Sequence, residues 1–352
     1  MLKKAAALFL IGASIAMWVG CGTTSSRYLY AAIPAGNQLV AYREDPNSGV
    51  LTPLAGSPIT AGPAVQSIVI HPSKKFLYAA NSGESDVSLF TMSSDGALTE
   101  VTPRTVVGTS PTLLVMDSAG SLLYVANSGS NSISVFSVDA GSGALTAVGS
   151  AFPIGITPLN MKLSPSGNVL YVTGAGSPAG FIEVFSLNAG APTFLQLVQP
   201  GANPYGLAID PSGAHLYTAN TGDNSISEFT INPDGSLTEL SGSPIGESFS
   251  TPLALLVDNS GKYLYVANEG SSNLAAYGIG TDGGLSLLTN SPFGTGSQPS
   301  FITSDPSGKY LFVGNQSGPV IQSFSLDGSS GTLTSVATYS VGNAATSIAV
   351  TP

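Results

Sequence analysis

"KYLYVAN" at residues 262–268 returns 47 residues later as "KYLFVGN" at 309–315. The aromatic residue that ends each such "LY" pair recurs at spacings of 46 to 48 residues, at Tyr30, Tyr78, Tyr124, Tyr171, Tyr217, Tyr265 and Phe312. Self-similarity with a fixed period of roughly 40 to 50 residues is typical of repeat architectures built from one small unit. The sequence therefore predicts seven copies of one unit over residues 27–352.

Each copy contains four short β signals in the same order. In the fifth copy they are "PYGLAID" (204–210), "LYTAN" (216–220), the alternating "SISEFTI" (225–231) and "SLTELSG" (236–242). The "PSG" and "DG" turns between them suit tight hairpins, because Pro presets φ and Gly accepts positive φ. Four strands per repeat predict the blade of a β-propeller. We therefore expect an all-β, seven-bladed β-propeller with four antiparallel strands per blade.

The two ends of the repeat region complement each other. The first copy begins at "RYLY" (27–30) without a first strand, whereas "AATSIAVTP" (344–352) is a first strand with nothing after it. Pairing them closes the ring and removes its open sheet edges. We expect one composite blade and six continuous ones, with boundaries near 27–57 plus 344–352, 63–107, 111–155, 158–200, 204–246, 252–295 and 299–342.

The N-terminus has the features of an export signal. Lys3 and Lys4 precede an apolar run over 5–19, a length typical of a signal-peptide core. Gly20-Cys21 ends that run and resembles the lipobox of bacterial lipoproteins, in which the cysteine becomes lipidated. We expect residues 1–21 to be a signal peptide and 22–26 a linker, giving a periplasmic or cell-surface lipoprotein anchored in the membrane at Cys21. Because Trp18 stands where leucine is expected, ordinary cleavage and an uncleaved anchor stay open.

Composition narrows the possible partners. The chain has 10 Lys plus Arg against 20 Asp plus Glu, a net charge of −10. Such a surface repels phosphate backbones, which require clustered basic residues, so we expect no nucleic-acid partner. Cys21 is the only cysteine, which excludes an internal disulfide. Stability must then come from the core, and we expect a monomer.

The repeated frame, with "DPSGKYLFVGN" (305–315) and "NSGKYLYVAN" (259–268) as its clearest copies, resembles the lactonase-family seven-bladed propellers. That family includes the cycloisomerase-type 6-phosphogluconolactonases and the carboxymuconate-lactonising enzymes, and related "YVTN" repeats occur in surface-layer proteins. The resemblance extends over the whole chain from about residue 27. It implies a propeller and, as a candidate activity, lactone hydrolysis.

The resemblance also implies a catalytic pattern, which is an Arg-His pair after the Pro that opens an inner strand and a Glu after the Asn of the next strand. In the matching frame Glu269 follows Asn268, but the Arg-His positions hold Leu253 and Ala254. Opening an ester ring needs a base and a cation for the developing oxyanion. None of the other copies supplies the pair, with Val65-Gln66, Thr112-Leu113, Leu159-Asn160, Tyr205-Gly206, Ser300-Phe301 and Thr346-Ser347 at these positions. We therefore expect Glu269 as a candidate catalytic residue without its partners.

Other candidate site residues are those that break the repeat or ring one mouth of the channel. Lys162 lies in an inner-strand column otherwise filled by Val69, Val115, Ala208, Leu256, Thr303 and Ala349. An unpaired buried ammonium is costly, so Lys162 either reaches solvent along its stem or binds a ligand. Among the mouth loops we expect Asp86, Asp223, Asn224 and Asn273 as ligand-binding candidates, although such residues also simply form turns. Carboxylates and amides of this kind can hold Ca²⁺, but the sequence contains no metal-binding motif and predicts no cofactor.

Three functions remain open from the sequence. The favoured one is an exported binding module that binds a small molecule, a glycan or a protein at its top face, which is the end of the channel where the strand-opening prolines lie. The second is a lactone hydrolase that uses Glu269 with Lys162 or Arg104 in place of the missing pair. The third is a structural protein of the surface-layer type.

Overall fold

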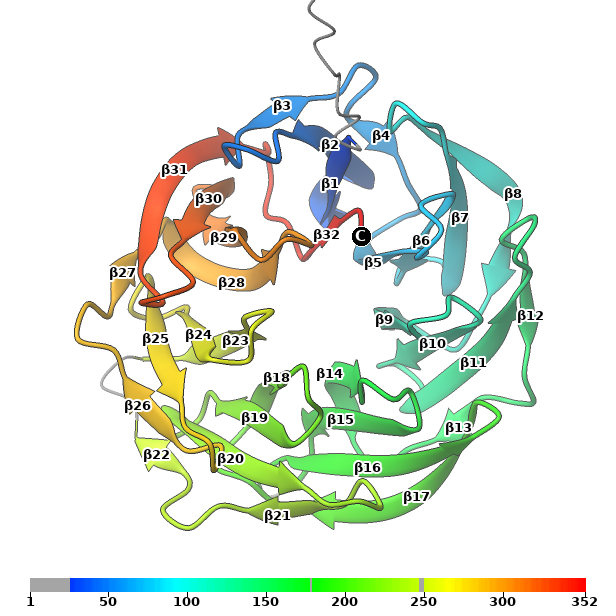
Figure 1. Ribbon diagram of the computed structural model, residues 1–352. Helices are drawn as coiled ribbons and strands as arrows, with labels where there is room; N and C mark the ends of the chain where they lie inside the picture. The colour runs from blue at the N-terminus through cyan, green and yellow to red at the C-terminus, as the bar shows by residue number, and fades with distance from the viewer. Residues whose placement is uncertain (1–25, 178, 247–249) are drawn as a thin grey trace, which may run out of the picture.

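The computed structural model describes residues 26–352 except 178 and 247–249, and forms a ring of seven β-sheets around a central channel (Figure 1). The expected all-β, seven-bladed propeller is confirmed. The expected signal peptide and Cys21 lie outside the described residues. Within the described ranges, no helix is long and apolar enough to cross a membrane.

Every blade is an antiparallel sheet whose strands run outward from the channel in sequence order, apart from the composite first blade. In blade 1 the order from outside to inside is β3 (Leu51–Pro53), β2 (Gln38–Glu44), β1 (Arg27–Ile33) and β32 (Ser347–Val350), with β4 (Ile59–Thr60) also on β2 and a single 3₁₀ turn, η1 (Pro34–Gly36). Blade 2 contains β5 (Val65–Ile70), β6 (Phe76–Asn81), β7 (Asp86–Met92) and β8 (Leu98–Val106). Blade 3 contains β9 (Pro111–Met116), β10 (Leu122–Asn127), β11 (Ser132–Val138), β12 (Leu145–Ala147) and β13 (Phe152–Pro153).

The remaining blades follow the same plan. Blade 4 contains β14 (Thr157–Leu163), β15 (Val169–Ala175), β16 (Phe181–Asn188) and β17 (Ala191–Val198). Blade 5 contains β18 (Pro204–Ile209), β19 (His215–Asn220), β20 (Ser225–Ile231), β21 (Leu237–Glu239) and β22 (Ile245–Gly246). Blade 6 contains β23 (Pro252–Val257), β24 (Tyr263–Asn268), β25 (Asn273–Ile279), β26 (Leu285–Leu287) and β27 (Phe293–Gly294). Blade 7 contains β28 (Ser297–Ser304), β29 (Tyr310–Ser317), β30 (Val320–Leu326) and β31 (Leu333–Ser340).

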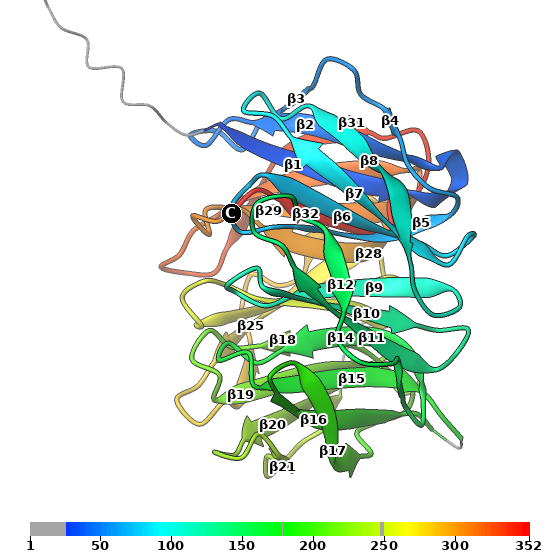
Figure 2. The ribbon, with the colours of Figure 1, turned by 90° about the vertical axis from the view of Figure 1, so that its right-hand side faces the viewer.

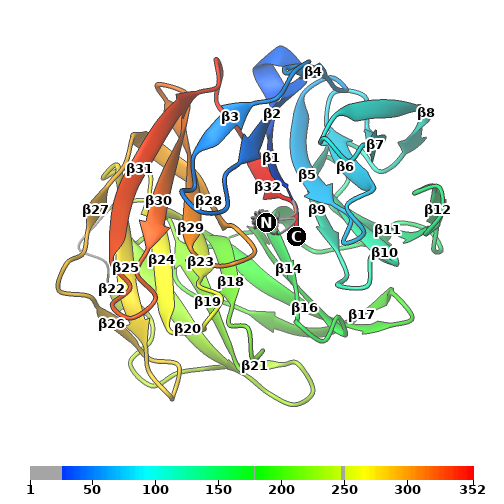
Figure 3. The ribbon, with the colours of Figure 1, turned by 45° about the horizontal axis from the view of Figure 1, so that its top comes forward.

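The ring closes through the C-terminal strand, as the sequence predicts. β32 pairs antiparallel with β1, with Tyr30 opposite Ala349 and Ala32 opposite Ser347. The Thr351 N–H extends this ladder by donating to the Tyr28 carbonyl at 2.8 Å. Figure 3 shows β32 beside β1 on the inner side of the sheet. The first blade is therefore made from both ends of the chain.

In five of the seven blades the repeated tyrosine connects the blade to the next one. All seven aromatic residues of this column are buried, and the Tyr265 hydroxyl donates to the Gly331 carbonyl of blade 7 at 2.8 Å. The same bond recurs around the ring from Tyr30, Tyr78, Tyr171 and Tyr217. Gly331 has a φ of +72°, a conformation that glycine adopts without strain. The "LY" and "DG" signals are thus two halves of one contact between blades.

The inner strands β32, β5, β9, β14, β18, β23 and β28 surround the channel. Figure 2 views the ring from the side, with β5, β9, β14 and β18 succeeding one another. We call the end at which these strands begin the proline face, since five of them have a proline within two residues of their start, namely Pro111, Pro158, Pro204, Pro252 and Pro299. The opposite end, where the turns after the inner strands lie, is the turn face.

Candidate functional site

A cavity of about 510 Å³ occupies the central channel and is lined by residues from all seven inner strands. Small-molecule sites typically measure roughly 300 to 1,000 Å³. Because each blade contributes equivalent positions, the wall consists of rings of seven residues at successive depths. The chemistry of the channel therefore depends on which blades depart from the common residue.

The frame in which the resemblance implies catalytic residues lies at the proline face of blade 6. The Glu269 N–H, just beyond β24, donates to the Thr251 carbonyl at 2.9 Å, which fixes Glu269 beside the start of β23. Glu269 is half-buried and stands at the rim, outside the set of residues that line the cavity. Leu253 and Ala254 on β23 do line it. Glu269 thus provides the acid that the resemblance implies, whereas apolar side chains occupy the two positions of the implied Arg-His pair.

Tyr205 on β18 lies close to this acid. Burial raises the pKa of the Tyr205 hydroxyl, and the negative charge of nearby Glu269 raises it further. Gly206 allows the close approach of the two strands, because a Cβ there would lie 2.5 Å from the Leu253 carbonyl oxygen. Blade 5 thereby places a phenol next to the positions that the Arg-His pair would occupy.

The sequence comparison named Tyr205 only as a residue that is neither Arg nor His. The residues at the same position in the other copies are aliphatic or polar and none is aromatic, so its aromatic ring was the signal that could have singled it out. The structure also corrects the position at which the inner strand of the second copy begins. Strand pairing puts Val65 opposite Asn81, as Pro111 is opposite Asn127, so the residues after the opening position there are Gln66 and Ser67. Neither is Arg or His.

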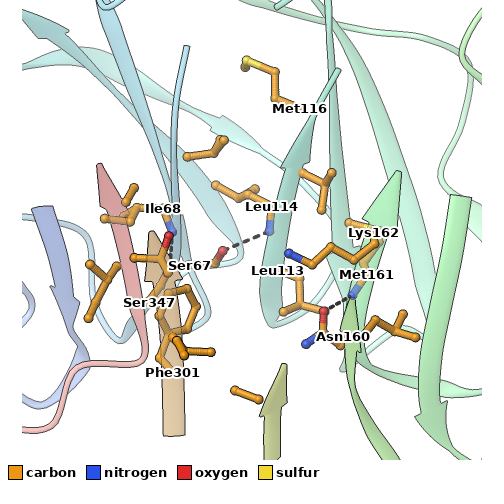
Figure 4. Close-up of a pocket in the computed structure, with 18 of the residues that line it drawn as sticks. Ser67, Ile68, Leu113, Leu114, Met116, Asn160, Met161, Lys162, Phe301 and Ser347 are labelled. Atoms are coloured by element: carbon orange, nitrogen blue, oxygen red, sulfur yellow. Dashed lines mark hydrogen bonds between the residues drawn. The ribbon is translucent and has the colours of Figure 1, made fainter. Parts of the chain in front are cut away.

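Lys162 and Asn160 form the second polar feature of the channel. They lie two residues apart on β14, where successive residues pair regularly with β15, so both side chains are on one face of the strand. In Figure 4 both extend from β14 toward the side on which Leu113 lies. The Asn160 Oδ1 accepts the Met161 N–H at 2.8 Å, which leaves the amide N–H groups facing the cavity.

The Lys162 amine has no partner among the described residues, since no hydrogen bond or ion pair of this part of the chain includes it. The expected column is confirmed, because Lys162 pairs with Tyr171 as Val115 pairs with Tyr124 and Thr303 with Phe312. Solvent reaches the side chain through the channel, although protein surrounds it. Desolvation lowers the pKa of the Lys162 amine, and no described acid offsets this.

The mouth residues named as ligand candidates have partners within the protein. Asp86 accepts the Asn81 amide at 2.7 Å, and Asp223 accepts the Ala202 N–H at 2.9 Å. Asn224 accepts the Thr251 N–H of the next blade at 2.8 Å, and Asn273 accepts the Asn268 amide at 3.0 Å. These bonds tie loops together. Ligand binding by these four residues stays a prediction.

Arg104, the second substitute cation considered for a hydrolase, lies on the outermost strand of blade 2. Its guanidinium donates to Glu100 at 2.7 Å and to Glu84 at 2.8 Å. It therefore holds an acidic cluster on the outside of the ring. This position is separated from the channel by three strands.

The unusual fourth copy has a structural explanation. Gly174 stands where five other blades have a buried Asn, and Glu183 on the neighbouring strand stands where blades 2, 3 and 5 have a serine. The Glu183 carboxylate accepts the Gly155 N–H at 2.9 Å, in the loop region that the Asn side chain contacts elsewhere. Burial raises the pKa of Glu183. Two linked changes thus preserve one contact.

Both histidines contact turns between an inner strand and the next strand. His71 Nε2 donates to the Gly120 carbonyl at 3.0 Å while its Nδ1 accepts the Ser73 N–H, and His215 Nδ1 lies 3.3 Å from Asp210. In the described part of the chain, no three His, Cys, Asp or Glu side chains are grouped so that they could hold a metal ion.

Residues 59–158, 155–247 and 246–350 match the family described as Lactonase, 7-bladed beta-propeller. The chain belongs to this family. This lactonase-family propeller is also similar to solved structures, with a TM-score of 0.79 and 22% identity to a candidate 6-phosphogluconolactonase from Bacteroides fragilis, over 94% of this chain and 99% of that one. For the periplasmic gluconolactonase of Pseudomonas aeruginosa the TM-score is 0.77 at 19% identity, over 93% and 99% of the chains. At these identities the likeness shows the fold. The comparison with curated proteins gave no match.

Proposed function

We propose that this lactonase-family propeller binds a small hydroxylated ligand in its channel at the proline face, without the hydrolysis characteristic of its family. The observation that carries this proposal is that Leu253 and Ala254 occupy the positions where the resemblance implies an Arg-His pair, although Glu269 is present at the position of the acid. Ring opening builds negative charge on oxygen, which two apolar side chains cannot stabilise.

Binding itself is supported by polar groups left free at the same end. The Ser300 hydroxyl lines the cavity and is buried without a hydrogen-bond partner among the described residues. A buried unpaired hydroxyl costs free energy that a ligand can recover. Tyr205 offers a further hydroxyl and Glu269 a carboxylate that accepts hydrogen bonds from ligand hydroxyls.

Calorimetric titration of the full-length chain tests the proposal, with glucono-δ-lactone and glucitol as probes. We expect binding that weakens about tenfold in Tyr205→Phe, which removes a hydroxyl group, and in Glu269→Gln, which replaces a charged acceptor by a neutral amide. Asp234→Asn is the matched control, because Asp234 forms an exposed turn far from the channel. If neither probe binds, the proposal is wrong.

Lactone hydrolysis is the second candidate, favoured by the family and by the proximity of Tyr205 to Glu269. The phenol could hold the developing oxyanion while the carboxylate positions water. Acid release from glucono-δ-lactone or 6-phosphogluconolactone, followed in a pH-stat, distinguishes the two candidates. Turnover above background that disappears in Glu269→Gln would establish the hydrolase.

We further propose that the propeller is a monomer held at the cell envelope through lipidated Cys21. The predicted signal peptide and the cysteine that ends it support this location. Cys21→Ser should move the protein from the membrane fraction to the soluble fraction after cell disruption. Assembly of the purified chain into ordered arrays would instead favour the surface-layer alternative.

A further inference from the structure

We infer that Lys162 and Asn160 form an anion subsite that takes the carboxylate of a hydroxylated monocarboxylic acid. The inference rests on the proposed binding function and specifies the ligand class. Three observations from the channel carry it.

First, the charge at this depth of the channel is uncompensated. The ring that contains Lys162 is completed by Val69, Val115, Ala208, Leu256, Thr303 and Ala349, all neutral. The described residues provide no carboxylate within ion-pairing distance of the amine. Lys162 is exposed to the solvent of the channel, and Asp117 at the turn face is the acidic side chain among the described residues that line the cavity. A cation on a mostly apolar wall favours an anionic ligand, because the ligand provides an opposite charge that the ring around the amine does not.

Second, the donors match one carboxylate. The Lys162 ammonium has three N–H groups, and the Asn160 amide presents its own because its Oδ1 is already engaged by the Met161 N–H. One positive charge with a neighbouring amide balances a single negative charge. A phosphate dianion generally requires more positive charge or a bidentate arginine, and the described channel lining contains no arginine.

Third, the polar groups of the proline face lie at a suitable distance along the channel. Tyr205 and Ser300 are three positions nearer the strand starts than the Lys162 ring, which corresponds to roughly 10 Å of strand. A chain of about six carbons with a carboxylate at one end spans this interval once the reach of the lysine is included. Its hydroxyl groups would then meet Tyr205, Ser300 and the rim carboxylate of Glu269.

Titration calorimetry with gluconate, glucitol and inorganic phosphate tests the subsite on the full-length chain. We expect gluconate to bind at least about tenfold more tightly than glucitol, since a charge-assisted hydrogen bond contributes a factor of ten or more. Lys162→Met should remove this preference of gluconate over glucitol, whereas Lys162→Arg should retain part of it. The matched control is Lys262→Met, which alters an exposed lysine at the turn face.

A measurement on the unaltered protein guards against misfolding of the variants. Gluconate should protect Lys162 from reductive methylation, mapped by peptide mass spectrometry, and should leave Lys262 reactive. Equal affinity for gluconate and glucitol would overturn the subsite while leaving channel binding intact. Tighter binding of phosphate would overturn the carboxylate assignment. No binding of either organic probe would refute the proposed function and the subsite together.

Discussion

Glu44 offers the sharpest test of the electrostatics at the ring closure. It lies on β2 opposite Arg27 and is 1% exposed, and neither carboxylate oxygen has a hydrogen-bond partner among the described residues. Arg27 is 3.6 Å from Glu44, beyond hydrogen-bonding distance, and binds Asp305 of blade 7 at 2.5 Å instead. Burial, followed by the charge of Asp305, raises the pKa of Glu44 to about 7, although Arg27 opposes this.

The sign of the pH dependence follows from that direction. Because the folded protein holds this proton more tightly than the unfolded chain, its contribution to stability is complete below the unfolded pKa of 4.5 and is lost as pH rises through about 7. A pKa difference between about 7 and 4.5 corresponds to about 3 kcal/mol in total, of which about 2.5 kcal/mol is lost between pH 5 and pH 8. Ionised Glu44 therefore destabilises the closed ring at alkaline pH.

We expect Glu44→Gln to remove this dependence. The difference in unfolding free energy, variant minus wild type, should rise by about 2.5 kcal/mol from pH 5 to pH 8. Urea unfolding followed by circular dichroism measures it without added ionic strength. Glu239→Gln, at an exposed carboxylate, is the control. A difference for Glu44→Gln that is the same at both pH values would refute the reasoning.

Three further predictions concern the ring itself. Tyr265→Phe should lower the unfolding free energy by about 1 kcal/mol, because it removes the hydrogen bond to Gly331. Tyr124→Phe should leave the unfolding free energy unchanged, because the Tyr124 hydroxyl has no partner in the described structure. Equal losses for the two variants in urea unfolding would contradict this. Removal of 344–352 should lower the melting temperature sharply, because β32 supplies the inner strand of blade 1, and an unchanged calorimetric transition would exclude that role. Gly206→Val should destabilise the protein by about 2 kcal/mol or more, because its Cβ would lie 2.5 Å from the Leu253 carbonyl; an unchanged urea midpoint would contradict the close approach of the strands.

The fold could be predicted from the sequence because the residues of each main contact recur in several copies of the repeat. Tyr265 and the glycine it binds recur as one pair around the ring, so an error in one copy is corrected by the others. The composite blade was predictable for a related reason, since a missing first strand at one end matched a surplus strand at the other. In the second copy, comparison of the repeats places the opening of the inner strand one residue too early. The reason is that Val65 stands where most copies have the proline that marks this opening.

The candidate site was only partly predictable because it depends on pairs that occur once. Glu269 and Lys162 could be found as departures from their columns. The proximity of Tyr205 to Glu269 could not, because it arises between blades 5 and 6 and depends on how closely Gly206 lets two strands approach. Likewise the sequence does not single out Glu44, because Asp305, whose negative charge acts on it, comes from the opposite end of the chain.

This difference between repeated and single contacts also explains where function can reside in such a ring. A contact that holds the blades and their loops together must be made in most blades. The hydrogen bonds of the repeated tyrosines and of the buried asparagines are of this kind. A side chain in the channel is free of that requirement, because its neighbours across the cavity need not match it. Lys162 is tolerated there because its side chain is exposed to solvent in the channel, which a ligand can displace. A single charge in a neutral ring of seven is therefore the position at which a ligand can be recognised without weakening the fold.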